Sequence, residues 1–237
     1  MMRKLRPLIV FNIIFAALFV GSIVYVTIRF GPELTRLVSD PHKFREYLLS
    51  FGPWSAGVFM LFQVLQVVIA VIPGEPVQIA GGYIFGTVWG TIYSTLGITI
   101  GYIIVFTSVK LFGYPLVKIF APKKELEKFS VLVNSPKLET TIFLLFLIPG
   151  IPKDILVYIA GLTPIKPVLF FIIITFARFP AMLGSSFIGA KIESSQYLIA
   201  IIFSVTASIL FVFGYIYKKR IINFIHLRLG KEKTIHK

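Results

Sequence analysis

Apolar residues fill long stretches of the chain that carry little charge. These stretches lie at residues 7–28, 54–72, 77–109, 140–165, 167–190 and 196–217. Because a helix needs about 20 apolar residues to cross a bilayer core, the pattern predicts a chain that is helical and almost wholly membrane-embedded. The first stretch follows Arg3, Lys4 and Arg6, is longer than the core of a typical signal peptide and has no cleavage-type sequence after it. We therefore expect an uncleaved N-terminal anchor.

Composition agrees with this pattern and excludes several classes of protein. Hydrophobic residues make up 57% of the chain and charged residues 14%, whereas soluble domains are about 45–50% apolar. The absence of cysteine excludes disulfides, cysteine-ligated zinc and thiol catalysis. The three histidines, His42, His226 and His236, lie far apart, so no metal-ligating spacing is present. We expect neither a metal nor a cofactor.

Two of the apolar stretches are interrupted by a Pro-Gly-x-Pro motif. The first motif contains Pro73, Gly74 and Pro76, and the second contains Pro149, Gly150 and Pro152. A proline removes a backbone donor and clashes with the preceding turn, so each motif should end a helix at membrane depth. The chain could then turn back as a re-entrant hairpin. Each motif is followed by Ala-Gly, which indicates a weak internal repeat.

The basic residues distinguish hairpins from full crossings. If every stretch crossed, the six lysines of residues 110–139 would lie opposite both termini, against the positive-inside rule. If residues 54–90 and 136–165 are hairpins, these lysines share the cytoplasmic side with both termini. The crossings then fall at residues 7–28, 91–113, 166–190 and 196–217, with outer loops at 29–53 and 191–195. The two hairpin-plus-crossing units have opposite orientations, as in many transporters.

The predicted fold is an all-α polytopic membrane protein. It is an inverted repeat of two re-entrant helical hairpins, each followed by a transmembrane helix, with further transmembrane helices at both termini. Residues 1–53 form the anchor and an interfacial amphipathic helix that begins at Asp40-Pro41, residues 54–190 form the core, and residues 191–237 form the last span and a basic cytoplasmic tail. Residues 122–133 are a second interfacial segment. For both interfacial segments, a solvated linker helix is the alternative.

Few ionisable residues lie in the embedded segments. They are Glu75, Lys153, Asp154 and Arg178. Because a bilayer core tolerates such groups poorly, each is a candidate for function. We expect Arg178, with Lys153, to bind an anionic headgroup, since a guanidinium matches phosphate oxygens, while the two carboxylates tune or release it. The alternative is that Arg178 forms a structural salt bridge. Tyr158, beside the second break, is either a headgroup ligand or a core residue.

Small residues at a spacing of four predict two smooth helix faces. The first face contains Gly82, Gly86, Gly90 and Ser94, and the second contains Ala177, Ala181, Ser185 and Gly189. Such faces allow close helix packing, and Gly161 after the second break is expected to pack in the same way. The alternative is that the faces part to open a groove for a lipid chain.

The ordered motifs resemble a known family. They are Pro73-Gly74-Glu75-Pro76, Gly81-Gly82, Phe85-Gly86, Gly90, Gly97, Pro149-Gly150-Ile151-Pro152-Lys153-Asp154, Tyr158, Gly161, Arg178-Phe179-Pro180 and Gly189. In this order, over roughly residues 50–190, they resemble the VTT-domain superfamily, also called the SNARE-associated Golgi protein family, which includes the bacterial DedA proteins. The resemblance implies that Glu75 and Asp154 are the hairpin acids and Arg178 the arginine of the following crossing.

The resemblance also carries an expected activity. Family members are thought to scramble phospholipids or to return undecaprenyl phosphate across the bilayer. Many DedA members carry a further acidic residue at the first hairpin and an additional arginine in the next crossing. Here residues 77–109 hold no charge, so the resemblance does not extend to a proton-coupled mechanism taken from those members.

These features predict flipping or scrambling of a phosphate-bearing lipid, such as a phospholipid or undecaprenyl phosphate, in a bacterial plasma membrane. The expected partners are membrane lipids with anionic headgroups; nucleic acid is not expected, and an oligomer is left open. We do not expect an enzyme, because no embedded His or Cys supplies a nucleophile or base. A lipid-modifying enzyme that uses the carboxylate pair, a small-ion or small-solute transporter, and a non-transport membrane scaffold are the alternatives.

The predicted topology can be tested by labelling single cysteines in the cysteine-free chain. Lys124→Cys and Lys231→Cys should be shielded from an impermeant thiol reagent applied outside, because both sites are predicted to be cytoplasmic. Glu193→Cys should react, because residues 191–195 are predicted to be an outer loop. Labelling of position 124 from outside would overturn the hairpin topology.

Overall fold

The structure is a computed structural model that describes residues 21, 25, 28–69, 73–120, 137–148 and 153–230. Of residues 69, 118–120, 211, 213–215 and 218–230 it describes the backbone alone. Several predicted features lie outside the described residues. They are most of the first span, the interfacial segment 122–133, Pro149, Gly150 and Pro152 of the second break, and the tail after residue 230.

The described residues form helices and no strand, which confirms the all-helical fold class. A helix at residues 28–39 comes first. It is followed by α2 (Pro41–Leu49), the 3-10 turn η1 (Gly52–Trp54), α3 (Ser55–Ile69), α4 (Gly74–Phe112), α5 (Tyr114–Phe120), α8 (Leu138–Leu147), α9 (Lys153–Gly161), α10 (Pro167–Glu193) and α11 (Tyr197–Gly230). Two of the described helices, α4 and α10, are long and apolar enough to cross a membrane.

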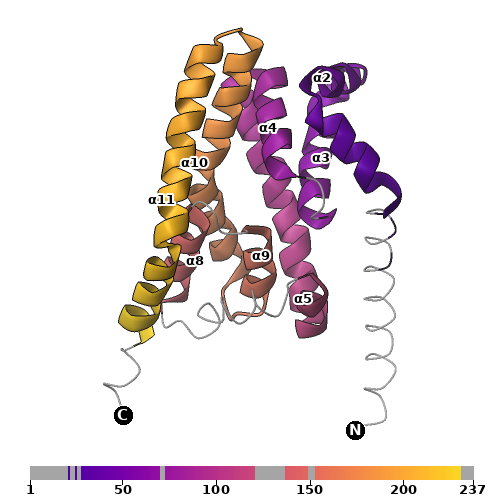
Figure 1. The fold of residues 1–237 in the computed structure, drawn as a ribbon. Helices are drawn as coiled ribbons and strands as arrows, with labels where there is room; N and C mark the ends of the chain where they lie inside the picture. Colours follow the sequence, from indigo (N-terminus) through magenta and orange to yellow (C-terminus); the bar gives the residue numbers. More distant parts are fainter. Residues whose placement is uncertain are drawn as a thin grey trace, which may run out of the picture.

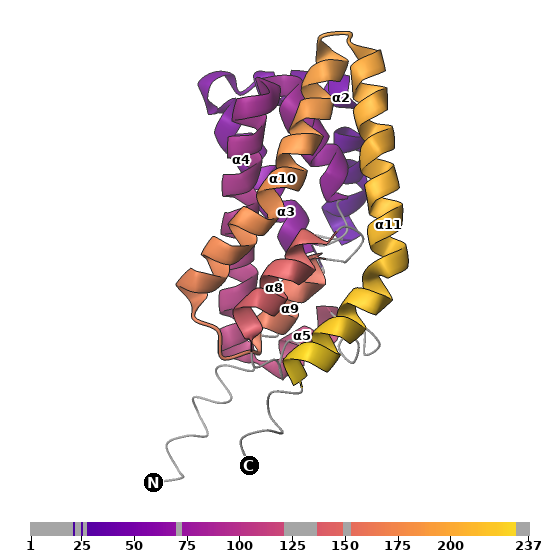
Figure 2. The same ribbon diagram turned by 90° about the vertical axis from the view of Figure 1, so that its left-hand side faces the viewer.

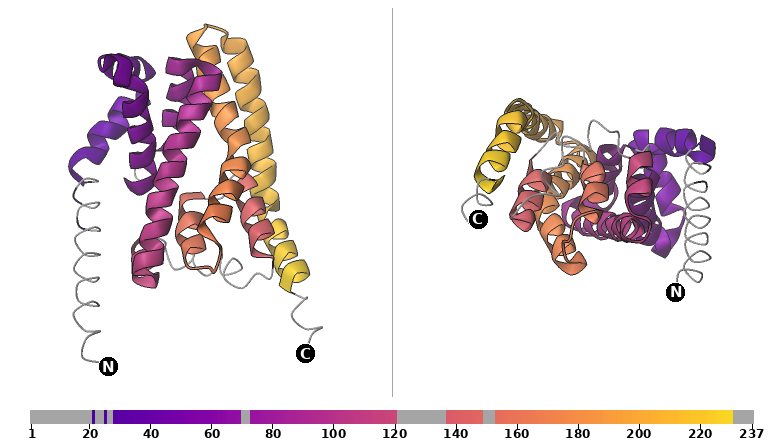
Figure 3. Two further views of the ribbon diagram at one scale, coloured as in Figure 1. Left: turned by 180° about the vertical axis from the view of Figure 1, so that it is seen from behind. Right: turned by 90° about the horizontal axis from the view of Figure 1, so that it is seen from below.

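The helices run between two ends of an elongated bundle (Figure 1). One end, called here the α2 end, holds α2 and the turn between α10 and α11. The other, called the α5 end, holds α5, the loop after α9 and the last turns of α11. Helices α8 and α9 lie beside α10 in the half of the bundle nearer α5 (Figure 2), and the view from behind shows the same order (Figure 3).

Helix α4 is two helices joined by a sharp reversal at Gly86. This residue has φ 75° and ψ 175°, a conformation that glycine adopts readily because it lacks a Cβ. A Cβ at Gly90 would lie 2.6 Å from the carbonyl oxygen of Gly81, so the chain has doubled back. We call residues 74–85 the short arm of α4 and residues 87–112 its long arm.

This reversal corrects the predicted packing role of Gly86. The spacing of four residues predicted one continuous face through Gly82, Gly86 and Gly90, but nothing lies within 4 Å of the Cβ position at Gly86. Gly82 and Gly90 instead lie on opposite sides of a turn. The long arm, which contains the predicted crossing 91–113, therefore begins just after residue 86. Spacing could not reveal this, because a glycine in a turn and a glycine in a helix face have the same sequence signature.

The long arm of α4 packs against α10 in the antiparallel direction. The hydroxyl of Thr95 donates to the sulfur of Met182 (3.2 Å), and the hydroxyls of Thr99 and Thr175 lie 3.4 Å apart. Further along, the ring of Phe106 stacks on the ring of Phe170 in α10, with centroids 4.6 Å apart. Residues later in α4 therefore contact residues earlier in α10, so the two helices run in opposite directions.

Each short helix that follows a break packs on the long helix of the other half. The short arm of α4 lies on α10, where Gly82 and Gly189 leave no room for a Cβ against the carbonyl oxygens of Ser186 and Ile79. Helix α9 lies on the long arm, where a Cβ at Gly161 would lie 2.7 Å from that of Val109. The missing side chains thus let the backbones approach closely.

Helix α2 is held against the bundle by its buried face and by polar contacts. The backbone N–H of Lys43 donates to Asp40 (3.2 Å), which caps the helix and lowers the pKa of that carboxyl. Phe44 and Leu48 are fully buried. Arg45 pairs with Glu193 of α10 at 3.2 Å. The predicted amphipathic helix is therefore present, and it contacts the far end of α10.

The close approaches predict which glycines tolerate a methyl group. Gly82→Ala and Gly189→Ala should each lower the free energy of unfolding by about 1–3 kcal/mol, because a backbone carbonyl oxygen cannot move as a side chain can. Gly57→Ala is the control, since nothing lies within 4 Å of its Cβ position, and it should leave stability unchanged or raise it. Denaturation by sodium dodecyl sulfate in mixed micelles measures the difference. Equal effects at the three sites would contradict the packing.

Candidate functional site

The two embedded carboxylates occupy equivalent positions after the two breaks. Glu75 is the second residue of α4, which Pro73 precedes in an extended conformation. Asp154 is the second residue of α9. Ile148, at the end of α8, is extended as expected for the residue before a proline. Both carboxylates thus lie in the first turn of a helix, where the helix dipole favours negative charge.

Arg178 is the buried cation of the site. It lies near the middle of α10 and is 9% exposed. Its Nη1 is 3.9 Å from Oδ1 of Asp154, and its guanidinium carbon is 5.3 Å from the ring centroid of Tyr102. Within the described part of the chain, Nε and Nη1 make no hydrogen bond. A buried guanidinium with unused donors is costly, so it marks the place where a ligand would be stabilised most.

Glu75 reaches the same region from the other half of the molecule. The hydroxyl of Ser185, two turns along α10 from Arg178, donates to Oε2 of Glu75 at 3.0 Å. The negative charge of Glu75 attracts both Lys153 and Arg178. The fold therefore brings the four predicted ionisable residues into one electrostatic cluster, although they come from three helices.

Exposure differs across this cluster. The side chain of Arg178 is 11% exposed, whereas that of Asp154 is 43% exposed. Lys153 is half-buried and Glu75 is exposed at the edge. Two carboxylates and two cations balance in formal charge. An anion that reached Arg178 would therefore pass the exposed members first and compete with Asp154 for the buried guanidinium.

The remaining predicted residues fall into structural positions. Tyr158 is 3% exposed and packs in the hydrophobic core around α9, and a role for it as a headgroup ligand stays a prediction. Pro73 precedes α4, Gly74 is its first residue, and Pro76 lies in its first turn. Gly90 packs closely against the backbone of Gly81, and Gly161 packs closely against the side chain of Val109.

Two hydroxyl-bearing residues that were not predicted as site residues bind the carboxylates. Tyr102 donates its hydroxyl to Oδ1 of Asp154 at 3.0 Å, and Ser185 holds Glu75 as described. Each carboxylate is thus hydrogen-bonded by a long helix of the opposite half. The sequence does not single out either residue, because a tyrosine or serine in an apolar helix is common and its partner depends on the fold.

A buried amide chain beside the first break was also missed. Nε2 of Gln66 donates to Oε1 of Gln63 (3.2 Å), and Nε2 of Gln63 donates to the hydroxyl of Ser94 (2.8 Å). The Oε1 atom of Gln66 contacts the site of Gly74, where a Cβ would not fit. This chain ties α3 to both arms of α4. Two glutamines three residues apart in an apolar stretch were the signal that could have revealed it.

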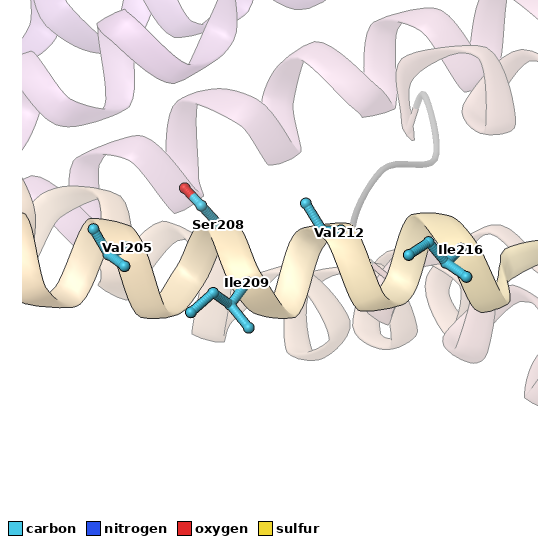
Figure 4. A pocket seen from close by; sticks show the side chains of 5 residues that line it. All are labelled: Val205, Ser208, Ile209, Val212 and Ile216. Carbon is cyan, nitrogen blue, oxygen red and sulfur yellow. The ribbon is translucent and has the colours of Figure 1, made fainter.

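A separate groove of about 320 Å³ lies along α11. Its described lining residues are Val205, Ser208, Ile209, Val212 and Ile216 (Figure 4). They come from a single helix, and Ser208 is the one polar residue among them. This groove can contact an apolar chain, but the charged cluster at α9 and α10 is the candidate functional site.

Comparison with known proteins gives one finding. A family model described as the VTT domain matches residues 72–191, a segment that begins at the first break and ends in the last turn of α10. Comparisons with curated proteins and with solved structures give no match.

The amide chain predicts a stability difference between two glutamines. Gln63→Leu should lower the free energy of unfolding by about 1–2 kcal/mol, because it leaves the Gln66 amide and the Ser94 hydroxyl buried without this partner. Gln196→Leu is the control: Gln196 accepts a bond from Lys191 at an exposed site, so the cost should be below about 0.5 kcal/mol. Adding Ser94→Ala to Gln63→Leu should restore part of the loss. An equal cost at positions 63 and 196 would contradict this network.

Proposed function

Because the chain belongs to the VTT-domain family, we propose that this membrane protein moves a phosphate-bearing lipid between the leaflets of a bilayer. The match confirms the family resemblance seen in the sequence. Family membership and the apolar helices α4 and α10 identify a membrane protein. The proposal adds the substrate class and the site that binds it.

One observation carries the proposal: Arg178 is buried beside the helices that follow both breaks, and two of its nitrogens have no hydrogen-bond acceptor among the described residues. A guanidinium forms strong charge-assisted bonds with phosphate oxygens. In a membrane such a group is rare and usually marks a pathway or ligand site. A phosphate headgroup would satisfy donors that the protein leaves unused.

The proposed membrane placement follows the two ends of the bundle. The long arm of α4 and α10 would cross the bilayer, because each exceeds the roughly 20 residues required. Helix α3 and the short arm would enter and leave at the α2 end, and α8 and α9 at the α5 end. The reciprocal packing, with the short arm on α10 and α9 on the long arm, supports an inverted repeat.

The orientation rests on charge. Lys110, in the last turn of α4, and Lys118, in α5, lie at the α5 end. The segment of residues 110–139 carries six lysines, and we assign this end to the cytoplasm by the positive-inside rule. The last turns of α11 lie at the same end (Figure 1). The α2 end, with Arg45 and Glu193, would then face outward.

In this mechanism the headgroup binds the unused donors of Arg178 beside Asp154. The phosphate would first meet the half-buried Lys153, whose positive charge attracts it, and would then pair with the guanidinium of Arg178. Glu75 and Asp154 would compete for Arg178 afterwards and promote release. Threonine hydroxyls at positions 95, 99 and 175 along the α4–α10 contact would offer polar groups to the headgroup, while the acyl chains stay in the hydrocarbon.

A lipid-exposure assay tests the proposal. Vesicles that contain the protein and a fluorescent phosphatidylglycerol should expose inner-leaflet lipid to an impermeant quencher faster than empty vesicles do. Arg178→Ala and Glu75→Ala should slow this exposure about tenfold or more, which corresponds to about 1.4 kcal/mol in the barrier. Arg36→Ala and Glu46→Ala are matched controls, because both residues are exposed outside the site, and they should leave the rate unchanged.

The alternatives give different results in the same vesicles. Ion or solute flux that depends on Arg178, without lipid exposure, would show that the transported substrate is an ion or a small solute and not a lipid. No flux of either kind from folded protein would favour a scaffold. A panel of headgroups with and without phosphate tests the substrate class, and equal rates across the panel would contradict phosphate recognition.

A further inference from the structure

Tyr102 is a fully buried residue that touches both charged members of the Asp154–Arg178 pair. It lies in the long arm of α4 and is 1% exposed. Its hydroxyl donates to Oδ1 of Asp154 at 3.0 Å, and its ring faces the guanidinium of Arg178 at 5.3 Å. A buried tyrosine hydroxyl needs a partner, but the ring position on Arg178 is an additional contact with a cation.

The same carboxylate oxygen is shared unequally between Tyr102 and Arg178. Oδ1 of Asp154 lies 3.0 Å from the tyrosine oxygen and 3.9 Å from Nη1 of Arg178. A hydrogen-bonded arginine–carboxylate pair has N···O distances of about 2.7–2.9 Å. Asp154 therefore neutralises Arg178 through space without taking up its donors, and this agrees with the unbonded Nε and Nη1 atoms of Arg178 in the described structure.

We propose that Tyr102 is a positioning residue that holds Asp154 off Arg178 and so keeps the guanidinium ready for a phosphate. The inference rests on the proposed function, because it assigns the phosphate of the transported lipid to Arg178. If the hydroxyl is removed, Asp154 can close on Arg178 and form a direct salt bridge. The phosphate must then displace a hydrogen-bonded carboxylate, which weakens its binding.

The first half of the molecule shows what Tyr102 adds. There Ser185 donates to Glu75 at 3.0 Å, so both carboxylates are restrained by a hydroxyl from the opposite half. Serine has no ring to contact a cation. Among the described residues, only the second carboxylate, Asp154, is held by a residue that also contacts Arg178: the hydroxyl of Tyr102 binds Asp154, and its ring faces the guanidinium.

A double-mutant cycle separates restraint of Asp154 from a general structural role. Binding of dihexanoyl phosphatidic acid to the full chain in detergent is measured by calorimetry for the wild type, Tyr102→Phe, Asp154→Asn and the double variant. Tyr102→Phe keeps the ring and should weaken binding about tenfold, the scale of one hydrogen bond to a charged group. In the Asp154→Asn background the same change should have no effect, because a neutral amide does not form a salt bridge with Arg178. Tyr197→Phe, at a residue 57% exposed, is the matched control and should bind as the wild type does.

The outcomes distinguish this inference from the proposed function. If wild type and Arg178→Gln bind the phosphatidic acid equally, the phosphate site itself is wrong. If binding depends on Arg178 but Tyr102→Phe has no effect, or an equal effect in both backgrounds, the positioning role alone is overturned. Should Tyr102→Phe not fold, Asp154→Asn alone still tests the competition: it should bind the phosphatidic acid more tightly than the wild type, and unchanged or weaker binding would overturn the proposal.

Discussion

The burial of Arg178 in an apolar helix bundle constrains the rest of the site. A guanidinium removed from water must be neutralised, and its donors favour acceptors that an all-apolar core cannot supply. The two carboxylates that act on it, Asp154 and Glu75, come from two different helices, α9 and α4. Both sit in first turns that exist because the chain breaks before them. The breaks in the chain, the dipoles of the helices that follow them and the charge of Arg178 on α10 therefore depend on one another.

Close backbone packing makes this arrangement possible. The first turns reach α10 and the long arm only because Gly82, Gly161 and Gly189 bring the backbones together. A larger residue would push the short helices outward and separate the carboxylates from Arg178. In a membrane there is little hydrophobic force between helices, so close packing and polar contacts must hold them. The amide chain from Gln66 to Ser94 supplies such contacts beside the first break.

The arrangement also reconciles the two interpretations of Arg178, as a headgroup ligand or a structural salt bridge. At 3.9 Å from Asp154, the pair is close enough for attraction but too long for a hydrogen bond. The charge of Arg178 is thus compensated, while its hydrogen-bond donors Nε and Nη1 stay unused among the described residues. A fully formed bridge would hold the site closed, whereas an unpaired cation would be too costly to bury. The intermediate state suits the proposed site, which would bind a phosphate and then release it.

The sequence by itself determined the helical class, the position of both breaks and the four charged residues, because apolar length, proline chemistry and the cost of buried charge act locally along the chain. It also carried the family motifs. Only the tertiary structure decided that Gly86 reverses the chain, and that Tyr102 and Ser185 bind the carboxylates. A glycine spaced at four residues fits either a packed face or a turn, and φ decides which. A hydroxyl finds its partner across segments far apart in sequence, and no local pattern encodes that pairing.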